Sequence, residues 1–510
     1  MGPGPGGRAR TARAPAAPAV RGRCVAHHRW CPLRRARRDR GSGDRGSRGR
    51  GALRPRGRGA HRRRNRGAHP ARNIVTAKDF VMTTDSPHPT LVLVYQRTSL
   101  PWIFESAERA GIDLVLVPRP DEAVSEDRLP PAVVDVLQLD IETDRAGALD
   151  ALRRRYEENA FQGIVTLYDP AVPFVAEAAE LLGLPGIGRD VALGAQDKRV
   201  MRERLAAAGL NVPGFVRLDE PADWEKAARL TFPVVVKPAH GFSSLGVTKA
   251  ESPQRLKSVV DEVWRTSASK LGQVDGLVVE EYLDGPEFAV ESLAHGGDVR
   301  ILTIGYKGDP QGPHFEEGVY RAPAALPETV QDDIRREVIA AHKALGITDG
   351  PTHTELRLRG GVTPYLLEMG ARIGGSGVSH YIASGVTGID FAAQALRIAA
   401  GIASEPLGSG PLPTPVGAAA NYIVPCGGYG RITTISGLDE LRDDPRVDHV
   451  VQMLFPGDVV RPYPDFTGYP AFVLSRHASI AETEEFHRFL EQAIRIEYAD
   501  DTDHSHEGQA

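Results

Sequence analysis

Two carboxylates are placed where they could hold a metal ion between them. Glu355 and Glu368 lie on two expected strands, 352–358 and 362–368, which an Arg-Gly-Gly turn joins. In such an antiparallel pair, facing Cβ atoms lie about 4.5–5.5 Å apart, and Mg²⁺ is commonly held by one or two carboxylates together with phosphate oxygens. The alternative is an exposed hairpin whose acids pair with arginine, because strand alternation also puts Arg357 on the face of Glu355.

A lysine at the end of a buried strand could meet a phosphate. Residues 234–236 are three valines that predict a short buried strand, and Lys237 ends it. The loop that follows is rich in small residues, which include Gly241, Ser243, Ser244 and Gly246. A lysine in this place is costly unless an anion meets it, and such a loop can direct several backbone N–H groups at one phosphate. A solvent-facing strand end with an ordinary turn would explain the same residues.

Two further segments carry residues suited to nucleotide chemistry. Arg372 is surrounded by glycines, and its fork of N–H donors suits the spread charge of a phosphoryl group during transfer. Segment 278–288 passes from strand to turn and back, so it exposes the backbone C=O and N–H groups that an adenine edge needs. Glu287, beyond the turn, could accept from ribose hydroxyls. An ordinary loop arginine and an ordinary acidic turn are the alternatives.

In their order and spacing these motifs resemble the ATP-grasp superfamily of carboxylate–amine ligases. The resemblance covers about residues 90–500, and its specific motifs lie between 197 and 375. They are Lys198, Lys237 with its loop, the run Glu280–Glu287, Glu355, Glu368 and Arg372. The resemblance implies an ATP-grasp fold that uses ATP and Mg²⁺, with Mn²⁺ able to replace magnesium. It also implies that an amide forms through an acyl phosphate, with release of ADP and phosphate.

On the triphosphate side, the resemblance implies a role for each motif. Lys198 and Lys237 would contact the α and β phosphates. The loop Gly241–Gly246 would be a flexible lid over the triphosphate. Glu355 and Glu368 would ligate Mg²⁺ on the opposite side of the anion.

On the nucleoside and substrate side, the resemblance implies further contacts. The backbone groups of Glu281 and Leu283 would hold the adenine, with Glu280 near its amino group. Glu287 would bind the ribose. Arg372 would contact the substrate and stabilise the acyl-phosphate step.

One position departs from the pattern of many family members. D-alanine–D-alanine ligases and biotin carboxylases carry Glu-x-Asn, with the Asn as a further metal ligand, whereas Gly370 follows Glu368 at that spacing here. The departure argues against both of those assignments and puts a second magnesium in doubt. The run Glu-Met-Gly-Ala-Arg-Ile-Gly-Gly at 368–375 resembles instead the L-amino-acid ligase branch, whose members make dipeptides. His314 resembles the substrate-pocket histidine of that branch, with a surface turn histidine as the alternative.

The distribution of charged residues divides the chain into a basic N-terminal part and an acidic remainder. The first 72 residues hold 22 arginines and two acids, which leaves 40 of the 62 basic and 64 of the 66 acidic residues for the rest. Residues 1–82, rich in Arg and Gly, cannot bury enough apolar surface to fold, so we expect them to be disordered. We expect translation to start near Met82, with a nucleic-acid arm or a transit peptide as alternatives. The acidic remainder gives no indication of nucleic-acid binding.

Alternating strands and helices predict an α/β fold in several parts. Between 90 and 190, strands at 91–95, 113–117, 133–139 and 163–167 alternate with helices, which indicates an open parallel sheet. No Gly-x-Gly-x-x-Gly follows the first strand, so dinucleotide binding is not supported. Three regions are expected beyond it: an ATP-grasp domain of α+β lobes at 191–405 with a lid subdomain at 211–283, a mixed C-terminal module at 416–498, and a disordered tail at 499–510.

Composition favours a soluble protein, and the cysteine count fits a reducing cytoplasm. Hydrophobic residues make up 41% of the chain and no apolar run approaches a membrane span. Cys426 is the only cysteine beyond the N-terminal extension, so neither a disulfide framework nor a zinc quartet can form there. We expect small-molecule carboxylate and amine substrates, and a homodimer is compatible with the sequence. The alternatives are a formate- or bicarbonate-using ligase, a natural-product amide synthetase, or a regulatory protein that binds ATP without catalysis.

Overall fold

The computed structural model describes residues 88–499, except 99, 123, 242–243, 273, 310–311, 313, 316–317, 403–409, 463–464 and 467. The expected disordered extension at 1–82 lies outside the described residues, as do residues 500–510 of the expected tail. Within the described part, no helix is both long and apolar enough to pass through a bilayer.

A parallel sheet of four strands begins the described chain. Its order is β3-β2-β1-β4, and the strands are Val133–Val136, Asp113–Val117, Thr90–Val94 and Gly163–Thr166 respectively. All its strand pairs are parallel, which confirms the open parallel sheet expected from the sequence. Three helices follow its strands: α1 (Trp102–Ala110), α2 (Arg145–Glu158) and α3 (Val172–Leu182). Gly111 ends α1 with a φ of 64°, a left-handed conformation that suits glycine.

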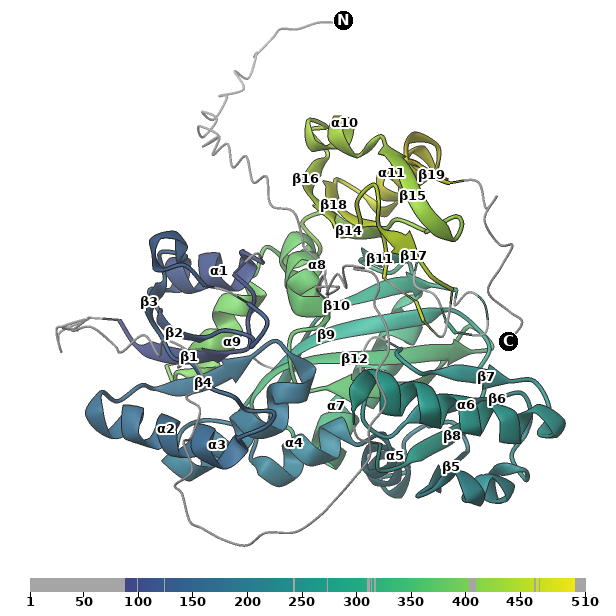
Figure 1. The fold of residues 1–510 in the computed structure, drawn as a ribbon, viewed down its shortest axis with the longest axis horizontal. Coiled ribbons are helices and arrows are strands. Elements are labelled where there is room, and N and C mark those ends of the chain that lie inside the picture. Colours follow the sequence, from purple (N-terminus) through teal and green to yellow (C-terminus); the bar gives the residue numbers. More distant parts are fainter. Residues whose placement is uncertain are drawn as a thin grey trace, which may run out of the picture. The chain divides into compact units, whose positions relative to one another are not determined.

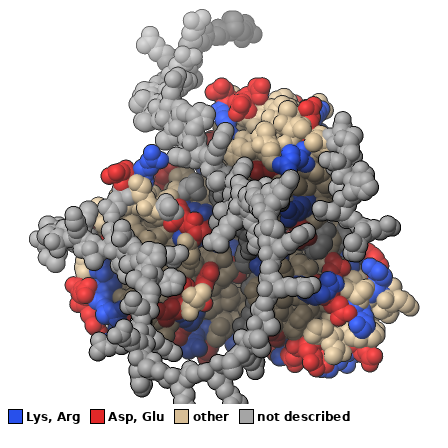
Figure 2. All heavy atoms as spheres, in the orientation of Figure 1, with Lys and Arg blue, Asp and Glu red and all other residues tan. Residues whose placement is uncertain are grey.

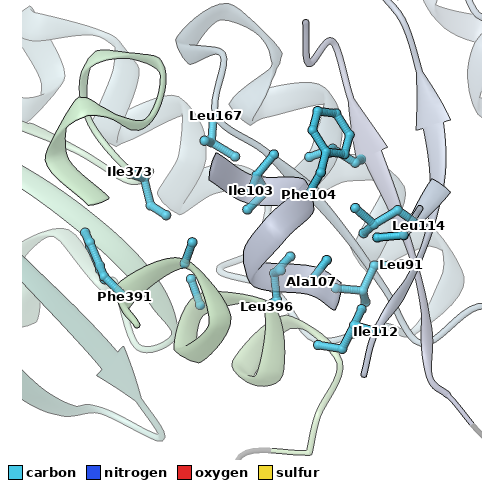
Figure 3. Close-up of a cluster of buried hydrophobic side chains, with 14 of the residues drawn as sticks. Leu91, Ile103, Phe104, Ala107, Ile112, Leu114, Leu167, Ile373, Phe391 and Leu396 are labelled. Atoms are coloured by element: carbon cyan, nitrogen blue, oxygen red, sulfur yellow. The ribbon is translucent and has the colours of Figure 1, made fainter. Parts of the chain in front are cut away.

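One face of the parallel sheet packs against a helix from a much later part of the chain. Leu91 and Leu114 of the sheet and Phe104 of α1 lie in one buried cluster with Leu396 of α9 (Phe391–Ala399), as Figure 3 shows. Burying an aliphatic or aromatic side chain of this size contributes about 1.5–3 kcal/mol. This packing fixes the sheet, and the loops at its strand ends, against the rest of the fold.

A second sheet is small and antiparallel. Its order is β5-β8-β6-β7, and the strands are Phe215–Leu218, Leu277–Glu281, Val234–Pro238 and Thr248–Ala250. Helix α6 (Pro253–Leu271) packs on β6 and β7 (Figure 1). Val234 and Val236 are buried in the core under this helix. Because side chains alternate along a strand, Lys237 leaves β6 on the opposite face.

The largest sheet has eight strands in the order β13-β12-β9-β10-β11-β14-β18-β16. In that order the strands are Thr363–Gly370, Gly350–Arg359, Glu287–His295, Asp298–Gly308, Val319–Ala322, Ala418–Ile423, Ala471–His477 and Val447–Gln452. Helix α7 (Glu328–Leu345) covers one face, where it packs on β13 and β10 and shares a buried cluster with Phe288, Val290 and Leu356. By alternation, the polar residues of β9 and β12 that lie between these positions face the other side of the sheet.

Several smaller elements complete the fold. They are α4 (Arg189–Gln196), α5 (Lys198–Ala207), α8 (Val378–Thr387), α10 (Leu438–Arg442), α11 (Ile480–Ala493) and the sheet β17-β15-β19, formed by Val459–Val460, Gly430–Ser436 and Arg495–Tyr498. Strands β14, β16 and β18 fall within the expected C-terminal module, yet they continue the eight-stranded sheet. That module is therefore joined to the central sheet through hydrogen-bonded strands.

Charges of both signs are mixed on the small-sheet part of the surface. At the lower right of Figure 2, basic and acidic side chains lie beside one another. Lys257 and Asp261 of α6, for example, form an exposed ion pair at 2.8 Å. Such exposed pairs contribute about 0–1 kcal/mol each, so this surface pattern affects solubility more than stability.

Candidate active site

Most of the residues singled out from the sequence meet at one cavity. Its walls come from the central sheet, from β6 and β8 of the small sheet, and from the loop after β6. Among its lining residues are Lys198, Lys237, Gly241, Ser244, Glu280, Glu281, Leu283, Glu287, Glu355, Glu368 and Arg372. Cations and carboxylates therefore share one cavity, as the binding of a polyphosphate together with a metal ion requires.

Two expected residues, Gly246 and His314, are not among the residues that line this cavity. Gly246 has a φ of 78°, and a Cβ there would lie 2.8 Å from Ser267 Oγ, so a side chain has no room. The Nδ1 atom of His314 lies 3.4 Å from Thr248 Oγ1, and its neighbour Phe315 lines the cavity in its place. Ser243 lies outside the described residues.

Glu355 and Glu368 are direct partners in the ladder between β12 and β13. The Lys307 ammonium lies 2.6 Å from Glu355, and the Lys198 ammonium lies 3.1 Å from Glu368. Burial on its own would raise the pKa of Glu355, but Lys307 and the adjacent His353 ring hold that pKa well below its ordinary value. Glu355 is therefore an anion at neutral pH, and its charge is matched by neighbouring cations.

His353 lies between two acids on the same face of the sheet. Its Nδ1 is 2.7 Å from Glu291 and its Nε2 is 3.5 Å from Glu355. Burial lowers the pKa of His353, but Glu291 and Glu355 together raise it to about 9. Glu291 is fully buried and also accepts hydrogen bonds from Ser379, at 2.8 Å, and from the Tyr320 hydroxyl. The network holds a charged imidazole beside one of the expected metal ligands.

Lys198 and Lys237 approach the cavity from different elements. Asp197 caps α5 by accepting from the Arg199 N–H at 2.8 Å, which places Lys198 at the first helical position. The Lys198 ammonium donates to the carbonyl oxygen of Gly241 at 2.8 Å. Lys237 lies near the end of β6. Both lysines therefore line the cavity, one from the start of α5 and the other from β6.

The buried carboxylate of Glu280 forms an ion pair with Lys237. Lys237 lies 2.7 Å from one oxygen of Glu280, and the fully buried Arg202 lies 2.5 Å from the other. Burial opposes the charge on Glu280, but Arg202 and Lys237 lower its pKa to about 2. Arg202 also donates to the carbonyl oxygens of Leu366 and Leu367 in β13. The sequence prediction did not include Arg202, which links the small sheet to the strand of Glu368.

Several lining residues were not predicted as site residues. They are Tyr282, Lys307, Phe315, His353 and Arg357. Lys307 and Arg357 contact the two oxygens of Glu287 at 3.0 and 3.1 Å. The alternation His353, Glu355, Arg357 along β12 is the signal that could have identified two of them, because it puts all three on one face.

An aromatic pair forms another part of the wall. The rings of Tyr282 and Phe315 stack with centroids 6.2 Å apart. The Arg357 guanidinium lies 5.3 Å from the Tyr282 ring and donates to the carbonyl oxygen of Leu283 at 2.7 Å. A flat apolar surface beside backbone carbonyl groups suits an adenine ring.

The carboxylate pair fits a magnesium ion that it shares with a ligand. Over the described residues, no group of three or more His, Cys, Asp or Glu could hold a metal ion alone. Glu355 and Glu368 therefore need further oxygen ligands, which a triphosphate would supply. Gly370 lines the same cavity without offering a ligand. A Cβ there would meet its nearest atom, Asp169 Oδ1, at 3.6 Å, an ordinary contact distance.

Comparison with known proteins identifies three family domains along the chain. An ATP-grasp N-terminal domain matches residues 104–186, an ATP-grasp domain matches 230–380, and an L-amino acid ligase C-terminal domain 2 matches 423–499. The last match lies where the sequence predicted a C-terminal module.

Individual relatives agree with these domain matches. A D-alanine–D-alanine ligase from Aromatoleum aromaticum is 35% identical over 227 residues, which cover 43% of this chain and 71% of that protein. An L-amino acid ligase from Bacillus licheniformis, known from its crystal structure, is 40% identical in sequence to this chain. The two structures match with a TM-score of 0.75 over 81% of this chain and 99% of that one.

A more distant structure shares the fold alone. A biotin carboxylase from Campylobacter jejuni has a TM-score of 0.60 at 16% identity, over 80% of this chain and 92% of that one. The matches as a whole confirm the resemblance recognised in the motifs. The chain belongs to the ATP-grasp family of ATP-dependent carboxylate–amine ligases.

Proposed function

We propose that this ligase joins the carboxylate of one amino acid to the amine of another, giving a dipeptide, ADP and phosphate. The observation that supports the proposal is the 3.1 Å contact of Lys198 with Glu368 at a cavity that Lys237, Glu355 and Arg372 also line. Similarity to the L-amino acid ligase of Bacillus licheniformis supports amino acids as the substrates.

The nucleotide would lie between the small sheet and the central sheet. Lys198 and Lys237 would bind the phosphates, and the backbone groups of Glu281 and Leu283 would bind the adenine edge. Glu287 would accept from the ribose hydroxyls. We further propose that residues 211–283 form a lid that closes over the bound ATP.

Two carboxylates would hold the metal ion. Glu355 and Glu368 would ligate Mg²⁺, which, when bound, neutralises phosphate charge and orients the γ-phosphate. Lys198 contacts Glu368 and Lys307 contacts Glu355, so each carboxylate has a neighbouring ammonium group that balances its negative charge.

The reaction proceeds in two displacements. An oxygen of the substrate carboxylate attacks the γ-phosphorus, the bond to the bridging oxygen breaks, and ADP leaves. The amine nitrogen of the second amino acid then attacks the acyl carbon, loses a proton, and displaces phosphate. Arg372 stabilises the negative charge on the phosphoryl group during transfer, so catalysis consists mostly of positioning and electrostatics.

A screen for ADP and phosphate release tests this function. Purified protein with ATP and Mg²⁺ is incubated with single amino acids, with amino-acid pairs, and with formate or bicarbonate. We expect release that depends on a pair, with dipeptide detected by mass spectrometry. Release of ADP and phosphate with formate or bicarbonate alone would indicate that the protein catalyses another ATP-grasp reaction. ATP binding without any release of ADP would indicate a non-catalytic protein.

We also propose a cytoplasmic location. Cys426 is the one cysteine beyond the N-terminal extension, and such sparse cysteine usage fits a reducing compartment. ATP and free amino acids are available together in that compartment. Fractionation of native cells, followed by detection of the protein, would test the location.

A further inference from the structure

The catalytic arginine of the proposed reaction is held by a residue from another sheet. Arg372 Nε donates to Asp169 Oδ1 at 2.6 Å, and the two side chains are only 15% and 14% exposed. Arg372 follows β13 of the eight-stranded sheet, whereas Asp169 follows β4 of the parallel sheet and begins the short 3₁₀ helix η2 (Asp169–Ala171). The contact therefore joins the parallel sheet to the cavity.

The loop that carries Asp169 is itself fixed. Thr166 Oγ1 donates to the carbonyl oxygen of Val94 at 2.9 Å and accepts from the Tyr168 N–H at 3.0 Å. The Gln196 side chain donates to the carbonyl oxygen of Asp169 at 3.3 Å. Asp169 thus lies at the carboxyl end of a parallel strand, where α/β sheets present their functional residues.

The hydrogen bonds of Arg372 leave one end of its guanidinium available. Nε bonds Asp169 and Nη1 donates to the carbonyl oxygen of Ile373 at 3.3 Å. Nη2 has no hydrogen-bond partner among the described residues, and Arg372 lines the cavity. Burial lowers the pKa of Arg372, but Asp169 and, less strongly, Glu368 and Glu355 raise it. The planar group is therefore charged and oriented, with its free N–H donors available for an anion in the cavity.

We propose that Asp169 is a positioning residue, which holds the guanidinium of Arg372 in the plane that meets the transferring phosphoryl group. The proposal rests on the role given to Arg372 in the proposed function. Without the Asp169 bond the guanidinium can rotate about its Cδ–Nε bond, and a displacement of about 1 Å costs on the order of 10² in rate.

Kinetics of a double-mutant cycle test this role. Asp169→Ala should lower kcat about 10²-fold in the wild-type background. The same change should alter kcat by less than about threefold in an Arg372→Ala background, because the two residues act as one unit. Asp169→Asn keeps an oxygen acceptor for Nε and should recover most of the rate. Equal losses in both backgrounds, or a fully active Asp169→Ala, would overturn the proposal.

A matched control separates positioning from general loss of structure. Glu177 of α3 pairs with Arg145 at 2.5 Å and lies in the same parallel-sheet region. Glu177→Ala removes a carboxylate–arginine pair there without touching Arg372, and it should leave kcat unchanged. Melting temperatures of all variants show whether each one is folded.

A spectroscopic measurement tests the contact without relying on activity. The Nε–H signal of Arg372, identified in arginine-labelled protein by its loss in Arg372→Lys, should exchange slowly with solvent in the wild type and Asp169→Asn. It should exchange fast in Asp169→Ala, and slow exchange there would refute the holding contact. If the wild type releases no ADP with any amino-acid pair, the proposed function fails, while this exchange measurement still decides whether Asp169 fixes the guanidinium.

Discussion

Glu355 and Glu368 stand opposite each other across β12 and β13, and an ammonium group lies beside each one. Like charges in such positions destabilise a sheet. The ladder tolerates this pair because Lys307 and Lys198 reach it from β10 and from the start of α5. The balance of charge at the cavity is thus set by residues far apart in the sequence.

Removing either carboxylate should disable the metal site. Glu355→Gln and Glu368→Gln should each lower ADP release by about 10²–10³-fold, because the charge that holds the metal on the phosphates is reduced. Both should also raise the Mg²⁺ concentration needed for half-maximal rate. Steady-state kinetics against a magnesium titration measure both effects.

The control for this test is Glu203→Gln, since Glu203 is an exposed residue that pairs with Arg217 on the surface. It should behave as the wild type. An unchanged magnesium requirement in both cavity variants would remove the metal-ligand assignment.

The buried Arg202–Glu280 pair should make a large contribution to stability. Arg202→Met leaves the buried Glu280 carboxylate with only Lys237 as a charged partner, and breaking a buried pair in this way costs about 3–5 kcal/mol. The double variant Arg202→Met/Glu280→Gln should recover part of the loss. Denaturant unfolding measures the free energies. The comparison variant Arg217→Met removes a half-exposed arginine and should cost no more than about 1 kcal/mol, so similar losses for Arg202 and Arg217 would contradict the prediction.

Stability should fall in mild acid because of His342. This buried residue of α7 contacts Thr352 Oγ1 at 2.9 Å and Ser292 Oγ at 3.2 Å. Burial lowers its pKa from 6.5 to about 4. As the pH falls, the unfolded chain binds this proton first, so the stabilisation is present above pH 6.5 and is lost as the pH falls toward 4.

The size of this pH effect can be measured by denaturant unfolding. A shift of this extent corresponds to about 3 kcal/mol for one proton. The variant His342→Gln should be less stable at neutral pH yet lose less of its free energy of unfolding between neutral pH and pH 4. Parallel curves for the variant and the wild type would show that another group is responsible.

Gly370 should accept the asparagine that other family members carry. Its nearest contacts would be ordinary ones, at 3.6 Å or more from a new Cβ, and its backbone has no positive φ. Gly370→Asn should therefore fold normally and place an amide oxygen at the cavity. We expect a lower Mg²⁺ requirement for ADP release, because an added oxygen ligand strengthens the site. Gly370→Ala is the matched control, and an identical magnesium dependence in both variants would contradict the expectation.

Much of the fold followed from local patterns. The Gly360–Gly361 turn, with φ values of 61° and 77°, sets the pairing from Arg359 opposite Thr363 to Leu356 opposite Leu366, and a register shift beyond Leu356 then brings Glu355 opposite Glu368. The expected third strand, 133–139, ends at Val136 in the structure. Helix α6 runs from Pro253 to Leu271, because proline is accepted at its first position and no helix breaker comes before Gly272. Helix α8 was not predicted, since its small and polar residues give little apolar periodicity.

Local patterns specify which residues of a strand share a face and where the charged motifs fall, because alternation and turn chemistry act over a few residues. Long-range packing instead brings Arg202 to Glu280, 78 residues away, and Arg372 to Asp169, 203 residues away. Contacts of this kind depend on how three sheets pack together. Charged groups buried at such a junction must find partners to offset their loss of hydration, and local sequence patterns do not specify which partners those are.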